Sequence, residues 1–214
     1  MKQEKTCNEP VRRVFVTVGT TSFEGLVNAV QSKDVLESFR NIGVEEVRVQ
    51  MGDSGTAEGK RTYQDLQLEF FRYKNDIKAD IERADLIVSH AGAGTVLDVL
   101  GQQKRLIVVP NDALMDNHQD ELATYLSVKK YAYSSTVATL SDTLNSVLTE
   151  DSRSPLPPAN SQTIDQFLTA QMNLSCEDSR SSVGRVSLGR LALVFIVVLA
   201  SFVVIIQDLT KKST

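Results

Sequence analysis

The chain has 214 residues, of which 42% are hydrophobic and 23% are charged. These ordinary globular proportions exclude a fibrous or wholly disordered protein, and the length suits one medium domain with appendages. Lysine and arginine number 23 against 27 acidic residues, for a net charge of -4, so nucleic acid is not expected as the main partner. Two distant cysteines and two histidines provide neither a disulfide framework nor a Cys/His zinc site, and a reduced, cytosol-facing protein is expected.

The two ends of the chain differ in character. Residues 1–10 are polar, lack an apolar stretch and predict an N-terminal tail rather than a signal peptide. The run 191–206 is uncharged, and Ser201 is its only polar side chain. A run that is apolar on every face favours a membrane span over the alternative, a buried helix of a soluble domain. We therefore expect a transmembrane tail anchor over 188–206, followed by a C-terminal tail over 207–214.

Short apolar runs alternate with helical spacing over residues 11–150, which predicts one domain there. Strands are expected over 14–18, 47–51, 66–73, 86–89 and 106–109, with a short one over 131–133. Helices are expected over 23–42 with a break near Ser32, over 75–84 with Asn75 as N-cap, and over 95–100, 118–126 and 140–148. The glycine-rich, charged range 52–61 predicts a loop. Residues 151–187 are expected to form a linker that includes an amphipathic helix over 164–174.

The predicted strands are apolar throughout and alternate with helices. This pattern indicates an α/β fold with a Rossmann-like parallel sheet covered by helices on both faces. Such sheets bind ligands at the carboxyl ends of their strands, where the loops gather. The segments that follow the predicted strands are therefore the candidate binding residues.

The first such segment holds Gly19, Thr20 and Thr21. Glycine allows a tight turn, and the hydroxyls and amides at the start of a helix can face an anion. A simple helix cap explains the same residues equally well.

The second segment lies between a strand and a helix and consists of His90, Gly92, Ala93, Gly94 and Thr95. Small residues leave bare backbone at a helix N-terminus, which suits a diphosphate, and an imidazole there can donate to phosphate. Asp98, one turn later, can accept hydrogen bonds from a ribose. The alternatives are a histidine that caps the turn and an acidic residue favoured by the helix dipole.

The third segment includes Asn117, His118 and Gln119, whose amides and imidazole suit sugar hydroxyls, although a solvated loop is an equally open interpretation. No G-x-G-x-x-G motif follows the first strand, so a nicotinamide-dependent oxidoreductase is a distant alternative. The residues by themselves predict a protein that binds a nucleotide or a nucleotide sugar.

Three stretches, over 14–23, 84–95 and 116–123, together resemble one known family in their order and spacing. They are similar to the donor-binding subunit of the UDP-N-acetylglucosamine transferase that adds the second sugar to dolichol-diphosphate-linked GlcNAc. That subunit is itself similar to the C-terminal half of bacterial lipid II synthase, a family 28 glycosyltransferase with the GT-B fold. The resemblance covers about residues 11–148.

The resemblance implies a UDP-GlcNAc site built from specific positions. Two turns would face the diphosphate: Gly19, Thr20 and Thr21 in the first, and His90, Gly92, Ala93, Gly94 and Thr95 in the second. Tyr73, Lys74 and Ile77 match a segment that holds the uracil, and Asn117, His118 and Gln119 match a stretch that reads the GlcNAc hydroxyls. Asp98 stands where relatives more often have a glutamate that contacts the ribose.

The resemblance also implies an incomplete enzyme, because a GT-B glycosyltransferase reacts between two halves and one half fits here. A membrane-bound partner would bind the dolichol-linked acceptor and supply the catalytic base, which leaves the catalytic residues unknown. Inverting β1,4 transfer is expected, with backbone amides stabilising the leaving UDP and no metal or other cofactor required. We expect the chain at the endoplasmic reticulum membrane, with its bulk in the cytosol. The alternative is a catalytically silent, tail-anchored regulator or scaffold of that complex.

Overall fold

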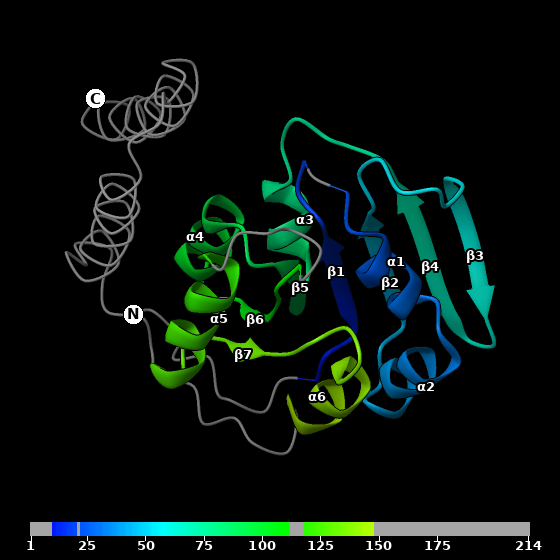
Figure 1. The fold of residues 1–214 in the computed structure, drawn as a ribbon. Helices are drawn as coiled ribbons and strands as arrows, with labels where there is room; N and C mark the ends of the chain where they lie inside the picture. Colours follow the sequence, from blue (N-terminus) through cyan, green and yellow to red (C-terminus); the bar gives the residue numbers. More distant parts are fainter. Residues whose placement is uncertain (1–9, 21, 112–117, 148–214) are drawn as a thin grey trace, which may run out of the picture. The chain divides into compact units, whose positions relative to one another are not determined.

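The computed structural model describes residues 10–20, 22–111 and 118–147 (Figure 1). These ranges contain a seven-stranded sheet in the order β3-β4-β2-β1-β5-β6-β7. The strands are β1 (Arg13–Thr17), β2 (Glu46–Gln50), β3 (Gly59–Tyr63), β4 (Leu66–Phe71), β5 (Leu86–His90), β6 (Arg105–Val109) and β7 (Tyr133–Ser134). The helices are α1 (Glu24–Val30), α2 (Lys33–Asn41), α3 (Lys78–Arg83), α4 (Ala93–Gly101), α5 (His118–Val128) and α6 (Leu140–Val147).

Six of these strands, from β4 to β7 in the sheet, run parallel, which confirms the predicted α/β, Rossmann-like architecture. β1 is central and pairs with β2 on one side and β5 on the other. The chain therefore changes direction across the sheet at β1. Ligands of open α/β sheets bind outside the carboxyl ends of the strands at such a switch point.

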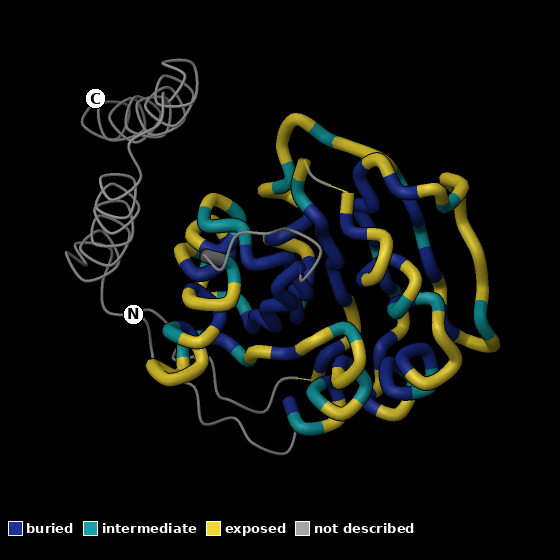
Figure 2. The backbone as a smooth tube through the Cα atoms, viewed as in Figure 1, coloured by how far each residue is buried: buried dark blue, intermediate teal, exposed yellow. Residues whose placement is uncertain are grey.

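One edge of the sheet corrects the sequence-based expectation. β3 pairs antiparallel with β4, so the sheet is not wholly parallel, and the predicted loop over 52–61 is wrong where β3 begins. A two-residue turn at Gln64 and Asp65 joins the strands, and Gln64 has a positive φ of 55°. Because β3 is exposed along most of its length (Figure 2), it shows no apolar alternation that could have revealed it.

The helices lie on both faces of the sheet. α1 and α2 belong to the crossover from β1 to β2, whereas α3 and α4 belong to crossovers that move across the sheet in the opposite direction. Right-handed crossovers therefore place these two groups on opposite faces. α6 returns to pack beside α2 (Figure 1). Every residue of β5 and β6 is buried between the two layers, as their apolar sequences predict.

Helix boundaries show which capping predictions hold. The break near Ser32 is confirmed, since Ser32 is the N-cap of α2 and its side chain accepts a hydrogen bond from the Val35 amide. The prediction of Asn75 as N-cap is wrong. The carboxylate of Asp76 instead accepts the Lys78 amide at 2.8 Å, and α3 begins at Lys78.

Several predicted features lie outside the described residues. They are the tail over 1–9, the linker over 151–187 with its helix over 164–174, the anchor over 188–206 and the tail over 207–214. Among the helices of the described ranges, none combines the length and apolar character needed to cross a bilayer.

A network of charged side chains underlies the carboxyl end of β4. The Asp80 carboxylate pairs with Arg48 and with Lys74, whose ammonium lies 3.0 Å away. Arg48 also pairs with Glu69 at 2.8 Å. Both cations lie near the Phe71 ring, Arg48 at 5.3 Å and Lys74 at 4.6 Å from its centroid. The network fixes the segment that connects β4 to α3.

The amino end of β1 provides a pH-dependent contact. Burial raises the pKa of Asp85, but hydrogen bonds from the Arg13 side chain and from the Arg12 and Arg13 amides outweigh it and hold the pKa below its ordinary value. The stabilisation is therefore present above about pH 3.9 and is lost as the pH falls through the lowered pKa.

Asp85→Asn should accordingly reduce the free energy of unfolding at pH 7 by about 1 kcal/mol. The difference from wild type should close as the pH falls toward about 2, because the Asp85 carboxylate is then protonated. Urea denaturation across this range measures both values. Asp53→Asn is the control, since the Asp53 side chain is exposed. A difference that stays constant down to pH 2 would contradict the assignment.

Candidate functional site

Three segments meet at the carboxyl edge of the sheet. The turns after β1 and β5 are adjacent because Thr17 pairs with Ser89 in the register of these strands. The Asn111 side chain, just after β6, donates to the Ser22 carbonyl at 3.3 Å. The structure thus brings the segments after β1, β5 and β6 together, as the parallel topology predicts.

His90 is the common neighbour of the two glycine turns. Its side chain is buried, and a Cβ atom added to either Gly19 or Gly92 would overlap the imidazole ring. Gly19 also has a φ of 66°, a conformation that favours glycine. The two glycines are therefore required by the close approach of the backbone to His90, a reason that spacing in the sequence does not reveal.

The electrostatic state of His90 follows from its burial. Its Nδ1 has no hydrogen-bond partner among the described residues. Burial lowers the pKa of His90, and an interaction with the Thr17 backbone opposes that shift only in part. The imidazole is therefore neutral at physiological pH, and it can donate one hydrogen bond without carrying a charge.

This lowered pKa can be measured directly, because the chain contains only two histidines. The His90 ring signal should titrate in NMR spectra with a midpoint below about 6.5 in the folded protein and near 6.5 in urea. Protonation then favours the unfolded state, so this stability is present above about pH 6.5 and is lost as the pH falls toward the folded pKa. A His118→Gln variant assigns the signal. A folded midpoint at or above 6.5 would show that the ring is solvated or paired with an anion.

The N-terminus of α4 is open to an anion. Gly92, its N-cap, offers no side chain, and the first helical hydrogen bond runs from the Val96 amide to the Gly92 carbonyl at 3.0 Å. The amides over 93–95 therefore have no intrahelical partner. Ala93 and Thr95 are half-buried and Gly94 is exposed. This arrangement of amides suits a phosphate group.

The turn after β1 differs from the expectation in one respect. The Gly19 amide donates to the Thr17 hydroxyl at 3.1 Å, so it is already used within the protein. Gly19 therefore serves the turn through its conformation rather than as an amide donor to a ligand. Thr20 is exposed beside it, and Thr21 lies outside the described residues.

The segment between β4 and α3 lies at the same edge. Tyr73 is 55% exposed, and Ile77 is half-buried at the N-cap position of α3. The Lys74 ammonium is held by Asp80, so its charge is used inside the protein. Asp98 on α4 is only partly covered by its neighbours. The pKa of its carboxyl is nevertheless raised, because partial burial and the Asp76 charge together outweigh the lowering by the Lys78 charge. Asp76 and Lys78, at the start of α3, therefore lie close enough to the second turn of α4 to affect the pKa of Asp98.

The third predicted segment is only partly described. Asn117 and the side chain of His118 lie outside the described residues, although α5 begins at His118. The Gln119 Oε1 accepts the Asn111 amide at 2.9 Å. Gln119 thus fixes the backbone after β6, a role that its position in the sequence did not indicate.

Three residues near the site were missed from the sequence: Thr17, Gln50 and Asp80. Thr17 and Gln50 are buried polar residues on paired strands, and their hydrogen bond could be foreseen only from the register of β1 and β2. Asp80 occupies the first turn of a helix, where an acidic residue is ordinary, so no local pattern marks it as buried. No group of potential metal ligands lies together within the described ranges.

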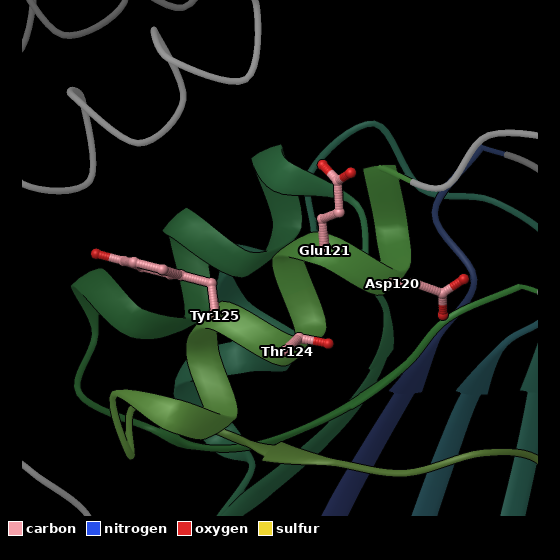
Figure 3. A pocket seen from close by; sticks show the side chains of 4 residues that line it. All are labelled: Asp120, Glu121, Thr124 and Tyr125. Carbon is pink, nitrogen blue, oxygen red and sulfur yellow. The ribbon is translucent and has the colours of Figure 1, made fainter. Parts of the chain in front are cut away.

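A separate hollow lies along α5 and is lined by Asp120, Glu121, Thr124 and Tyr125 (Figure 3). All four side chains come from one helix, and none belongs to the turns around His90. The hollow therefore has no convergent set of polar groups comparable to that of the sheet edge.

Comparisons with known proteins relate this geometry to a family. The profile of the glycosyltransferase family 28 C-terminal domain matches residues 13–173. The UDP-N-acetylglucosamine transferase subunit ALG13 of Homo sapiens is 43% identical over 113 residues, which are 53% of this chain and 10% of that protein. The protein of the same name from Eremothecium gossypii is 34% identical in an alignment 194 residues long, which covers 77% of this chain and 95% of that protein.

A solved structure of similar fold is also known. An NMR solution structure of ALG13 matches with a TM-score of 0.59 and 24% identity, covering 74% of this chain and 95% of that one. The chain spans about a tenth of the length of its human and mouse relatives.

Proposed function

The chain belongs to the glycosyltransferase family 28 C-terminal domain family, and we propose that it is the donor-binding subunit of a heteromeric glycosyltransferase. Its reaction transfers GlcNAc from UDP-GlcNAc to GlcNAc-diphosphodolichol. The relatives named UDP-N-acetylglucosamine transferase subunit support both the donor and the need for a partner. The observation that carries the proposal is the meeting of the Gly19 and Gly92 turns around His90, beside the uncapped N-terminus of α4.

In this proposal the diphosphate lies against the amides over 93–95, where the helix dipole and N–H groups stabilise negative charge. The neutral His90 ring holds the two glycine turns together. The ribose lies toward Asp98 and the base toward Ile77, on the side of the sheet edge formed by α3 and α4. Thr20 and Thr21 are assigned to the diphosphate-facing first turn, and Asn117, His118 and Gln119 to the GlcNAc hydroxyls.

The reaction that fits this site is a direct displacement. The acceptor hydroxyl attacks the anomeric carbon of the donor GlcNAc, and the bond between that carbon and the UDP oxygen breaks. The configuration at the carbon inverts to give a β1,4 linkage. The hydroxyl proton passes to a base on the partner. Charge on the departing UDP grows as the bond breaks, and the α4 amides stabilise it most in the transition state.

The partner is proposed to be a membrane-bound subunit that binds the dolichol-linked acceptor. The apolar range 188–206 is proposed to anchor this chain in the endoplasmic reticulum membrane, with the domain over 11–150 in the cytosol. An anchor would raise the local concentration of the subunit near its partner. Carbonate extraction of membranes from cells that express the full chain, with and without 188–206, tests this part separately.

The test of the proposal is reconstitution. The full chain should bind UDP in calorimetric titration but transfer no labelled GlcNAc by itself, and co-expression with its membrane partner should produce transfer to GlcNAc-diphosphodolichol. If the full chain binds no UDP, the donor site is wrong. Transfer by the partner-free chain would refute the need for a second subunit, and a partnered complex that binds UDP without transferring sugar would indicate a regulatory role.

A further inference from the structure

The β1 residue Thr17 lies beneath the first glycine turn, out of reach of any ligand. Thr17 is completely buried, and its neighbour Gln50 on β2 is only 2% exposed. The Thr17 hydroxyl donates to the Gln50 Oε1 at 2.6 Å and accepts the Gly19 amide at 3.1 Å. This single hydroxyl therefore joins the sheet to the turn whose glycine packs against His90.

The hydrogen bonds of Thr17 have a direction that suits this role. Gln50 takes the hydroxyl proton, which leaves the oxygen lone pairs to receive the Gly19 N–H. Gly19 holds a φ of 66°, and its turn passes so close to His90 that no Cβ fits there. Because the turn has no room to shift toward His90, the position of its first residues must be fixed. The buried, hydrogen-bonded pair of Thr17 and Gln50 fixes it.

We propose that Thr17, oriented by Gln50, is a positioning residue that sets the first glycine turn for the diphosphate of a nucleotide. This inference rests on the proposed function, because it assumes that the turn faces the diphosphate of UDP. Thr17 touches no ligand, so its effect passes through Gly19. Loss of the hydroxyl should therefore weaken ligands that carry phosphate and spare the nucleoside alone.

The matched variants are Thr17→Val, which keeps the side-chain shape without the hydroxyl, and Thr17→Ser, which keeps the hydroxyl. In the full chain, Thr17→Val should weaken UDP binding about tenfold, because the Gly19 amide and the Gln50 carbonyl both lose a partner. Thr17→Ser should stay within about threefold of wild type. Uridine binding, measured by NMR titration, should be the same in all three proteins.

Each outcome decides the question. Equal loss of UDP and uridine affinity in Thr17→Val would mean a general structural role, and unchanged UDP affinity would mean no role; both overturn the inference. If Thr17→Val does not fold, Gln50→Met, which removes the side-chain amide that accepts the hydroxyl proton and leaves Thr17 in place, should give the same selective loss of UDP at about threefold. An absence of selectivity there overturns the inference as well. Failure of the wild-type chain to bind UDP would instead refute the proposed function.

Discussion

Gly19→Ala is expected to abolish measurable UDP binding and to lower the free energy of unfolding by about 3 kcal/mol. Two costs act together at this position. A side chain at a φ of 66° is strained, and its Cβ would overlap the buried His90 ring. The turn must therefore move away from the amides of α4, and the site loses its shape. Urea denaturation and calorimetric titration with UDP measure the two effects.

Gly101→Ala is the matched control for this variant. Gly101 ends α4 outside the candidate site, and an added Cβ would meet no atom within 4 Å. Alanine there should leave UDP binding unchanged and should not reduce stability. Gly92→Ala should reproduce the loss, and adding His90→Ala to it should restore part of the stability because the overlap is relieved. If the double variant is no more stable than Gly92→Ala, crowding against His90 is not the cause.

Asp80→Asn is expected to lower the free energy of unfolding by about 3 kcal/mol. The Asp80 side chain is only 3% exposed and lies between the charges of Arg48, itself 18% exposed, and Lys74. Asparagine removes the negative charge, so Lys74 loses this partner and Arg48 keeps its ion pair with Glu69. A buried charge without its partner is costly because water cannot replace the lost contact. Urea denaturation at neutral pH measures the loss.

Asp65→Asn provides the comparison for this prediction. Asp65 also pairs with an arginine, Arg40, but its side chain is 78% exposed. Asp65→Asn should lower the free energy of unfolding far less than Asp80→Asn does, since exposed ion pairs are weak and screened by salt. Arg48→Met in the Asp80→Asn background should recover part of the stability, because one of the two cations that lost Asp80 is then absent. Equal losses in Asp80→Asn and Asp65→Asn would exclude burial as the source of the effect.

The elements that the sequence predicted well are those whose periodicity is set by burial. β5 and β6 are buried on both faces, so their apolar runs mark them without ambiguity. The break at Ser32 was visible because a serine side chain can replace the missing helical acceptor. β3 was missed because its pairing with β4 leaves its side chains exposed, and exposed strands need no apolar pattern.

The candidate site was predictable in position and less so in detail. Parallel strands bring their carboxyl ends together, so the turns that hold Gly19 and His90 had to be neighbours once the topology was assumed. Whether a polar group of the site is available to a ligand depends on which other residues of the protein it already contacts. The Gly19 amide is taken by Thr17 and the Lys74 ammonium by Asp80, and neither pairing follows from local sequence.

The lateral edges of the sheet discourage growth by strand addition. β3 presents Lys60 and Arg61 along an exposed strand, with the Arg61 guanidinium 4.7 Å from the centre of the Phe70 ring. At the opposite edge, β7 offers only two residues for pairing. Charged or very short edge strands are poor templates for another backbone, which protects a protein against aggregation. We therefore expect the proposed partner subunit to bind surfaces made of helices and connecting segments, where side chains rather than backbone hydrogen bonds determine specificity.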